Sequence, residues 1–298
     1  MNDPIDIVVP FLIPNEKWQE EYKKYSNEYG YKTPNRFRDW GAMKYWFRAV
    51  EENCSWINKV FLVLFDENQI PDWLDTTNPK LRIVFHRDFI PEEFLPTFNT
   101  VTIEMFLHRI EDLSNNFIYS NDDMYFLKKI PADTFFINNK PVSPLKSCTH
   151  NMRPIREGID YILNNNINCL KTMLKNVYNC DHPHLFIPMN KLFMEFVWYK
   201  CEDVLLKSLA NSRLRNNKNI GFWLFDDAQR VTNHAITNKN IFRNSLYFGN
   251  SNGNFNNCKN KDMICFNDLD SQKNFEQVKQ KFLNFLNSKL PNKSSFEK

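Results

Sequence analysis

The stretch that decides the fold runs from Leu81 to Phe126 and reads LRIVFHRDFIPEEFLPTFNTVTIEMFLHRIEDLSNNFIYSNDDMYF. Its pattern predicts a strand at Leu81–Phe85, a proline-containing loop, an amphipathic helix and a second strand at Asn116–Ser120. The second strand contains FIY, a short apolar run rich in strand-forming residues, as a buried strand of a parallel sheet does. The stretch therefore indicates an α/β fold.

The helix in this stretch is predicted from the spacing of its apolar residues. The residues at i, i+3, i+4 and i+7 form one apolar face: Ile103, Phe106, Leu107 and Ile110. Glu104 and His108, four residues apart, share another face. The helix is therefore expected to bury one side and to carry two titratable side chains on another.

Two carboxylates, Asp122 and Asp123, follow the second strand. Open α/β sheets bind their ligands at the carboxyl ends of strands. Paired carboxylates there suit Mg²⁺ or Mn²⁺ bridging a diphosphate, because hard cations take oxygen ligands and share them with substrate phosphates. A solvated turn is the alternative, because Asn and Asp are common turn residues. Spacing alone leaves both interpretations open.

Two more buried strands are predicted upstream, at Ile5–Pro10 and Val60–Phe65. Between them, Asn15–Asn35 is expected to be a polar, aromatic loop, and a helix is expected at about Gly41–Glu51 with Asp39 as its N-cap. The resulting order, β-α-β-β-α-β, fits a Rossmann-like, mostly parallel α/β sheet with three-layer packing.

Beyond Pro131 the chain is expected to be largely helical, with a β-hairpin within Asp133–Leu145. The predicted helices span Ile155–Leu163, Lys191–Asn211 and Phe222–Val231. A strand at Met263–Phe266 then precedes a final amphipathic helix. Arg48 is expected to lie off the buried stripe of its helix, and the pair Asp226-Asp227 is expected to face solvent.

Composition restricts the class of protein. The chain has 298 residues, 42% hydrophobic and 24% charged, which is ordinary for a soluble globular protein. A net charge of +3 is too small to indicate a nucleic-acid partner. No apolar run approaches the roughly 20 residues of a membrane span, and the N-terminus lacks the basic region of a secretory signal.

The cysteines and histidines give two further expectations. The seven cysteines show no CxxC spacing, which favours reduced thiols and a cytoplasmic location over a disulfide framework. His182 and His184 flank Pro183 without a Cys or His at zinc-finger spacing, so no structural zinc site is expected there.

Several segments resemble the longest conserved block of the Stealth family, in the order that the family has. They are RFRDWGAMKYWFRAVEENCSWINKVFLV, IPDWL, LPTFNTVTIEMFLHRI and FIYSNDD, within Arg36–Phe126. The resemblance continues around His182–Ile220 and in ICFND and KSSFE, so the chain is expected to be complete to its C-terminus. Stealth proteins are sugar-1-phosphate transferases of bacterial capsules and surface polysaccharides, related to the N-acetylglucosamine-1-phosphotransferase of animals.

The resemblance implies a glycosyltransferase-A-like sheet in one catalytic domain, residues 1–298. Residues 1–135 would hold the nucleotide-sugar, residues 136–298 would close the site, and residues 262–290 would form a final strand and helix. The implied reaction moves a sugar-1-phosphate from UDP-hexose or UDP-N-acetylhexosamine to a glycan hydroxyl and releases UMP. Acceptors of the family include lipid-linked glycans, which implies peripheral association with the inner face of the cytoplasmic membrane.

The resemblance also assigns catalytic roles. Asp122 and Asp123 would bind Mg²⁺ or Mn²⁺, with Asp268 in support. His184 would act as general base, with His182 in reserve, because a neutral imidazole accepts a hydroxyl proton near pH 7. Metal and base would thus come from separate parts of the chain.

The remaining assigned residues would bind substrate. Arg215, Arg36 and Arg38 would hold the diphosphate, because guanidinium groups pair well with phosphate. The other substrate-binding positions are Asn99, Glu104, Asn121, Lys191 and Asn267.

Two other functions stay open. A metal-dependent glycosyltransferase releasing UDP would show the same strand-end carboxylates, and a non-catalytic glycan- or nucleotide-binding relative would keep the fold. Ile13 stands where the family has a polar residue after the first strand, which favours the non-catalytic alternative. The retained NDD, Arg215 and Asn267-Asp268 argue against it.

Overall fold

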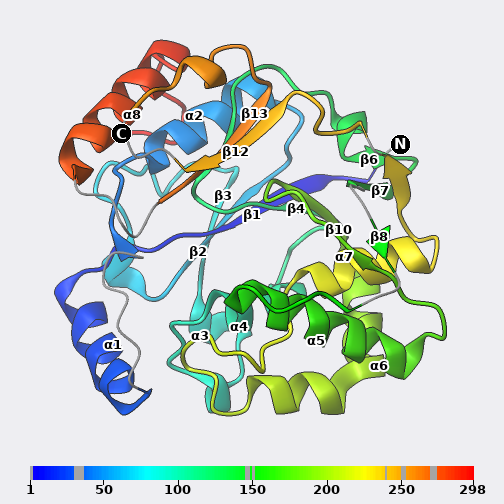
Figure 1. The fold of residues 1–298 in the computed structure, drawn as a ribbon. Helices are drawn as coiled ribbons and strands as arrows, with labels where there is room; N and C mark the ends of the chain where they lie inside the picture. Colours follow the sequence, from blue (N-terminus) through cyan, green and yellow to red (C-terminus); the bar gives the residue numbers. More distant parts are fainter. Residues whose placement is uncertain are drawn as a thin grey trace.

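The computed structural model describes residues 3–29, 37–144, 148–149, 152–238, 240–249, 253–268 and 274–298. At its centre is a five-stranded sheet in the order β10-β4-β1-β2-β3 (Figure 1). The strands span Ile5–Pro10 (β1), Val60–Leu64 (β2), Leu81–Phe85 (β3), Asn116–Tyr119 (β4) and Ile187–Asn190 (β10). β1 to β4 run parallel and β10 antiparallel. The predicted Rossmann-like, mostly parallel α/β sheet is confirmed.

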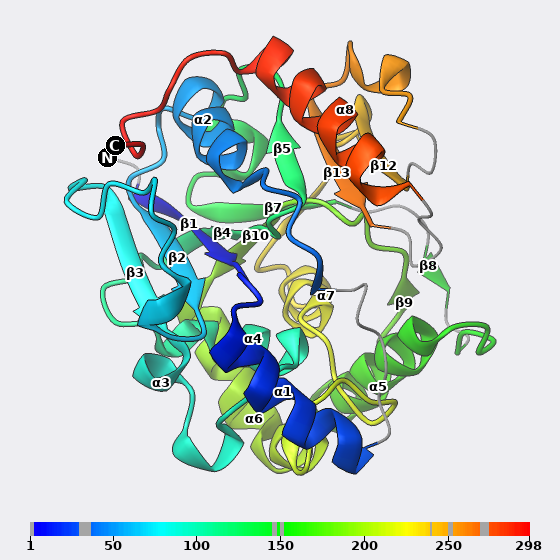
Figure 2. The ribbon, with the colours of Figure 1, turned by 90° about the vertical axis from the view of Figure 1, so that its left-hand side faces the viewer.

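Helices cover both faces of this sheet (Figures 1 and 2). Alternate residues of a strand point to opposite faces, so Ile7 and Val9 pack with α2 and α8, whereas Val8 packs with α4, α6 and α7. The helices are α2 (Met43–Asn53), α4 (Thr100–Met105), α5 (Gly158–Met173), α6 (Lys191–Leu209), α7 (Trp223–Val231) and α8 (Phe275–Lys289). Among the described residues, no helix combines the length and apolar character that crossing a membrane requires.

A second sheet, in the order β12-β13-β5, brings the end of the chain to the end of β4. Its strands are β5 (Met124–Phe126), β12 (Ser245–Gly249) and β13 (Met263–Asn267). β5 follows β4 after a short turn and pairs antiparallel with β13. The smaller strands are β6 (Phe136–Ile137), β7 (Lys140–Pro144), β8 (Cys148–Thr149), β9 (Asn179–Cys180) and β11 (Ile236–Asn238). The β6–β7 pair is the predicted hairpin.

The expected loop at Asn15–Asn35 is wrong over most of its described part, because residues Glu16–Tyr29 form helix α1. Trp18 stacks on Tyr22 with ring centroids 5.1 Å apart, and both rings pack edge-on against Phe98. The helix therefore forms because the aromatic residues, which suggested an irregular segment, fall at helical spacing and share one cluster.

Helix α4 is shorter than the helix predicted there. It ends at Met105 and continues only as a 3₁₀ turn, Leu107–Arg109. Glu104 and His108, expected to share a face other than the apolar one, are both buried. Asp39 is not an N-cap either, because α2 starts at Met43 and the Asp39 carboxylate accepts instead from the Gly41 N–H at 2.7 Å.

Arg48 was expected away from the core and is instead buried against the C-terminal segment. Its guanidinium donates two hydrogen bonds of 2.7 Å to the Glu297 carboxylate and one of 3.0 Å to the Leu290 carbonyl. Phe296 beside it packs on Phe47 with centroids 4.9 Å apart. The KSSFE motif thus fastens the end of the chain to α2.

The expectation of reduced thiols is wrong for Cys180, which is disulfide-bonded. Its backbone pairs with that of Cys148 across β8 and β9, a contact between segments far apart in sequence. The other described thiols that are free are Cys54, Cys169, Cys201, Cys258 and Cys265, all buried.

Candidate active site

The Asn121-Asp122-Asp123 turn joins β4 to β5 at the carboxyl end of the parallel strands, as predicted. Three elements fix it by hydrogen bonds. Trp46 of α2 donates to Ser120 Oγ at 3.1 Å, and Tyr125 of β5 donates to the Asp122 carbonyl at 3.0 Å. The Phe266 N–H of β13 donates to the Asp123 carbonyl at 2.8 Å. The position of the two carboxylates is therefore set by the fold around them.

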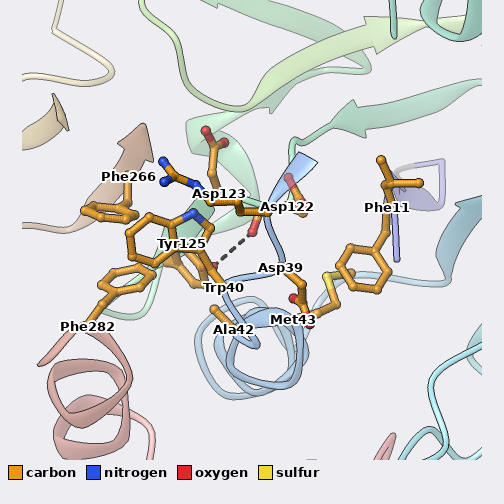
Figure 3. Close-up of a pocket in the computed structure, with 12 residues that line it drawn as sticks. Phe11, Asp39, Trp40, Ala42, Met43, Asp122, Asp123, Tyr125, Phe266 and Phe282 are labelled. Carbon is orange, nitrogen blue, oxygen red and sulfur yellow. Dashed lines mark hydrogen bonds between the residues drawn. The ribbon is translucent and has the colours of Figure 1, made fainter. Parts of the chain in front are cut away.

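A small cleft of about 50 Å³, open to solvent, lies over this turn (Figure 3). Its lining residues are Phe11, Leu12, Arg38, Asp39, Trp40, Ala42, Met43, Asp122, Asp123, Tyr125, Phe266 and Phe282. In Figure 3 the side chains of Asp122 and Asp123 leave the turn in different directions. A cleft lined mostly by apolar and aromatic side chains, with a few charged groups among them, is typical of a ligand site.

The surroundings of Asp122 and Asp123 disfavour the charged form of both carboxylates. Loss of solvent around the carboxylate, followed by the nearby charge of Asp39, raises the pKa of Asp122 to about 6, although the residue reaches the surface. Burial and the charge of Asp122 raise the pKa of Asp123 to about 7, and contact with the Cys265 thiol acts in the opposite direction. Negative charges crowded in this way are what a bound cation relieves.

Arg38 and Asp268 meet at the wall of the cleft. The guanidinium donates to both carboxylate oxygens, at 2.9 and 2.5 Å, and Trp40 Nε1 donates to the same carboxylate at 3.2 Å. Asn267 ends β13 beside them. Arg36, the other predicted arginine, lies outside the described residues.

His184 approaches the carboxylates from the loop before β10. Its Nδ1 lies 3.2 Å from Cys265 Sγ. Burial and the positive charge of Arg215 lower the pKa of His184 to about 4. His184 and Arg215 are therefore close enough to interact, and the imidazole is neutral near pH 7.

Tyr119, the last residue of β4, links further predicted residues to this site. Its hydroxyl lies 2.6 Å from a Glu104 carboxylate oxygen and 2.5 Å from Asn121 Oδ1. Burial and Glu104 raise the pKa of Tyr119. To a smaller extent, the positive charge of Arg215 lowers it and the negative charge of Asp123 raises it. Glu104 and Asn121 therefore contact one hydroxyl, and the charges of Arg215 and Asp123 lie near enough to affect it.

His182, in contrast, belongs to a buried charge network. Its ring nitrogens lie 3.5 Å from Asp226 and 3.2 Å from Asp227, and Arg230 pairs with Asp227. Burial alone would lower the pKa of His182, but the two carboxylates raise it to about 9. The expectation that Asp226-Asp227 faces solvent is wrong, because these carboxylates, 1% and 2% exposed, neutralise a buried imidazolium.

Two other predicted residues have structural partners. The Asn99 side chain caps α4 and donates to Ser212 Oγ at 2.9 Å and to Asn219 Oδ1 at 3.0 Å, and it is buried. Lys191 donates to the carbonyl of Ile110 at 2.9 Å. The structure therefore gives both residues a role in holding segments together.

Sequence reasoning missed Asp39, Trp40, Tyr125 and Cys265. Asp39 and Trp40 stand in the same matched block as Arg38, and Cys265 precedes Asn267-Asp268 by two residues, so proximity to assigned residues was an available signal. Ligand atoms of Asp123, His184 and Cys265 lie within 4.8 Å of one another. His184 thus has a cysteine neighbour that no local spacing rule could reveal.

The comparisons with known proteins show which family the chain resembles. A family model described as Stealth protein CR2, conserved region 2, matches residues 36–143. The chain is 32% identical to the capsular polysaccharide phosphotransferase WcwK of Streptococcus pneumoniae, over 99% of this chain and 98% of the relative. It is 31% identical to the receptor polysaccharide phosphotransferase WefC of Streptococcus gordonii, over 100% of both chains.

Among solved structures, the galactosyltransferase LgtC is similar with a TM-score of 0.41 and 8% identity, over 97% of this chain and 98% of that one. The full-length relatives, which are named as phosphotransferases, show that the chain is a transferase with a mostly parallel α/β sheet. The chain belongs to the Stealth family, whose matched members are phosphotransferases of surface polysaccharides. The predicted family and enzyme class are confirmed.

Proposed function

We propose that the protein transfers a sugar-1-phosphate from a nucleotide-sugar to a glycan hydroxyl in surface polysaccharide synthesis. The donor is a UDP-hexose or UDP-N-acetylhexosamine, and UMP is released. One observation carries the proposal: Asp122 and Asp123 line a cleft at the end of β4, and His184 and Arg215 lie within electrostatic reach of the same turn. The names and full-length identity of the relatives support the reaction class.

The carboxylates fit a hard divalent cation. Asp123 Oδ1 is buried and has no hydrogen-bond partner among the described residues, and the pKa values of Asp122 and Asp123 are both raised. Asp122 and Asp123 would hold Mg²⁺ or Mn²⁺, which neutralises charge on a bound diphosphate. Asp39 lines the same cleft and adds a third carboxylate.

His184 is the proposed general base. Its Nδ1 faces the Cys265 thiol, which leaves Nε2 to take the proton of the acceptor hydroxyl. Burial and the positive charge of Arg215 hold the pKa of His184 at about 4. A bound diphosphate, which is anionic, would raise the pKa of His184 towards the range that suits a base near pH 7.

The arginines differ in their proposed roles. Arg215, whose charge reaches His184 and Tyr119, would stabilise the negative charge on the transferred phosphate. Arg38 is bound to Asp268 through both carboxylate oxygens, so its proposed role is to position Asp268 and Trp40 in the cleft wall. Glu104, through Tyr119, would position Asn121 for the substrate.

We place this activity in the cytoplasm, with a lipid-linked glycan as acceptor at the inner face of the membrane. The relatives' names, which refer to capsular and receptor polysaccharides, support a role in surface polysaccharide synthesis. The disulfide at Cys180 removes reduced thiols as an argument for this compartment. Cell fractionation tests it: recovery of the native protein outside the cytoplasm would contradict the location.

The products released distinguish the reaction from its main alternative. In sugar-1-phosphate transfer the acceptor oxygen bonds to the β-phosphorus, the bond from that phosphorus to the bridging oxygen breaks, and UMP leaves. In glycosyl transfer the acceptor oxygen bonds to the anomeric carbon, and UDP leaves. We expect incubation with a panel of UDP-sugars and a glycan acceptor to yield UMP and a phosphodiester product. UDP with a phosphorus-free glycan would establish the glycosyltransferase instead.

A further inference from the structure

We propose that Asp123, His184 and Cys265 form a site for Zn²⁺ or a similar transition metal, and that filling this site stops transfer. The three residues come from the turn after β4, the loop before β10 and strand β13. The blocking effect rests on the proposed function; the binding itself does not.

The geometry is close to that of a zinc site. One ligand atom from each residue lies within 4.8 Å of the other two, and His184 Nδ1 is 3.2 Å from Cys265 Sγ. Around tetrahedral zinc, bond lengths of about 2.0 Å to nitrogen and about 2.3 Å to sulfur place these two atoms about 3.5 Å apart. The nitrogen and sulfur atoms are therefore already close to the separation that a shared zinc ion requires, and the Asp123 oxygen, within 4.8 Å of both, would complete the set by moving towards the ion.

The set of donor atoms selects the ion. Imidazole and thiolate favour Zn²⁺ and its neighbours in the first transition series, whereas Mg²⁺ prefers oxygen ligands. Asp123 Oδ1 is a buried acceptor with no hydrogen bond among the described residues. Buried polar atoms usually have a partner, and a cation between Asp123, His184 and Cys265 would supply one.

Occupation would affect the reaction in two ways. Asp123 would be taken from Mg²⁺ or Mn²⁺, and the His184 imidazole would be held away from the acceptor hydroxyl. Cys265 sets this protein's sensitivity, because Asp123 and His184 alone offer only two ligands. The protein should therefore be inhibited by Zn²⁺ even when Mg²⁺ is in excess.

Cobalt spectroscopy tests the binding. Co²⁺ added to the purified metal-free protein should give a thiolate-to-cobalt band in the near ultraviolet and the intense visible bands of tetrahedral Co²⁺. The Cys265→Ser variant should lose the thiolate band, and the matched control Cys258→Ser, which changes a buried thiol outside the cluster, should keep it. A weak octahedral spectrum, or a thiolate band that survives Cys265→Ser, would overturn the site.

Competition against a zinc-sensitive dye gives a second measurement, in case Cys265→Ser does not fold. His184→Ala should weaken Zn²⁺ binding about 100-fold or more, since even outer-shell partners are worth 10–100-fold. Equal affinity in the folded variant would contradict the proposal. The ratio of transfer activity without Zn²⁺ to activity with Zn²⁺ should fall towards one in the Cys265→Ser variant. If no UDP-sugar is turned over, the proposed function fails while the cobalt spectrum still decides the site.

Discussion

Arg38 and Asp268 form a two-pronged ion pair although 230 positions separate them in sequence. The pair joins the segment before α2 to the end of β13 at the wall of the cleft. Two residues assigned from separate motifs thus form one ion pair. The contribution of each to the stability of the fold should therefore depend on the presence of the other.

A double-mutant cycle measures that dependence. Arg38→Ala and Asp268→Ala should each destabilise the protein, but the double variant should lose less than the sum, with a coupling of about 1 kcal/mol or more. The reason is that either single change leaves a partly buried charge without its partner. Urea unfolding of the four proteins gives the coupling. Additive losses would show that the pair contributes nothing of its own.

Asp122→Ala and Asp123→Ala should each lower turnover by at least about 10²-fold. Each change removes a carboxylate that would bind the cation, and the charge on the diphosphate is then no longer neutralised. Steady-state assays with Mg²⁺ or Mn²⁺ measure this, and EDTA should abolish the wild-type activity. Asp133→Ala is the matched control, since Asp133 is an exposed aspartate away from the cleft. Full activity in EDTA would contradict the metal role.

Substitution of His184 should affect catalysis, whereas substitution of His182 should affect stability. His184→Ala should reduce kcat by about 10²-fold or more, as removal of a general base does. His182→Ala should instead lower the free energy of unfolding by about 3 kcal/mol, because it leaves Asp226 buried without its cation and Asp227 with Arg230 alone. Kinetics and urea unfolding on both variants decide the assignment. A reversed pattern would move the base to His182.

The C-terminal ion pair predicts acid sensitivity. Burial alone would raise the pKa of Glu297, but the hydrogen bonds from Arg48 and the Ser294 backbone lower it below its ordinary value. A carboxyl with a lowered pKa stabilises the fold above its unfolded pKa of about 4.3, and this contribution is lost as pH falls through the folded value. Unfolding measured from pH 7 to pH 3 should show that loss in the wild type.

Glu297→Gln provides the comparison for that measurement. The variant should be less stable at pH 7 and should lose less stability on acidification than the wild type does. Glu276→Gln, a change at the first turn of α8 outside this contact, should keep the wild-type slope. Parallel acid profiles for wild type and Glu297→Gln would show that the pair does not control acid unfolding.

The central sheet could be predicted because its signals are local. Strands buried on both faces are continuous apolar runs, and VFLVL and NFIY ended within about a residue of their predicted limits. The Asp122-Asp123 turn could be placed for the same reason, since the carboxyl end of a parallel strand is a known position once the strand is known.

The charged interior could not be predicted, because its partners are remote in sequence. Nothing near Arg48 indicates Glu297, and nothing near Asp226-Asp227 indicates that His182 will bury itself between them. A charged residue is ordinarily exposed, and that prior fails where a counter-charge arrives from another segment. Asn99 shows the same limit: its assignment as a substrate contact did not foresee the Ser212 and Asn219 side chains that surround it.

The position of β13 and α8 has a consequence for how the protein is made. One face of the central sheet, which includes Ile7 and Val9 of the first strand, is covered in part by residues that follow Met263. During translation this apolar surface leaves the ribosome long before its cover exists. The nascent chain should therefore depend on chaperones over that interval, and synthesis arrested before β13 should yield an aggregating fragment rather than a folded half.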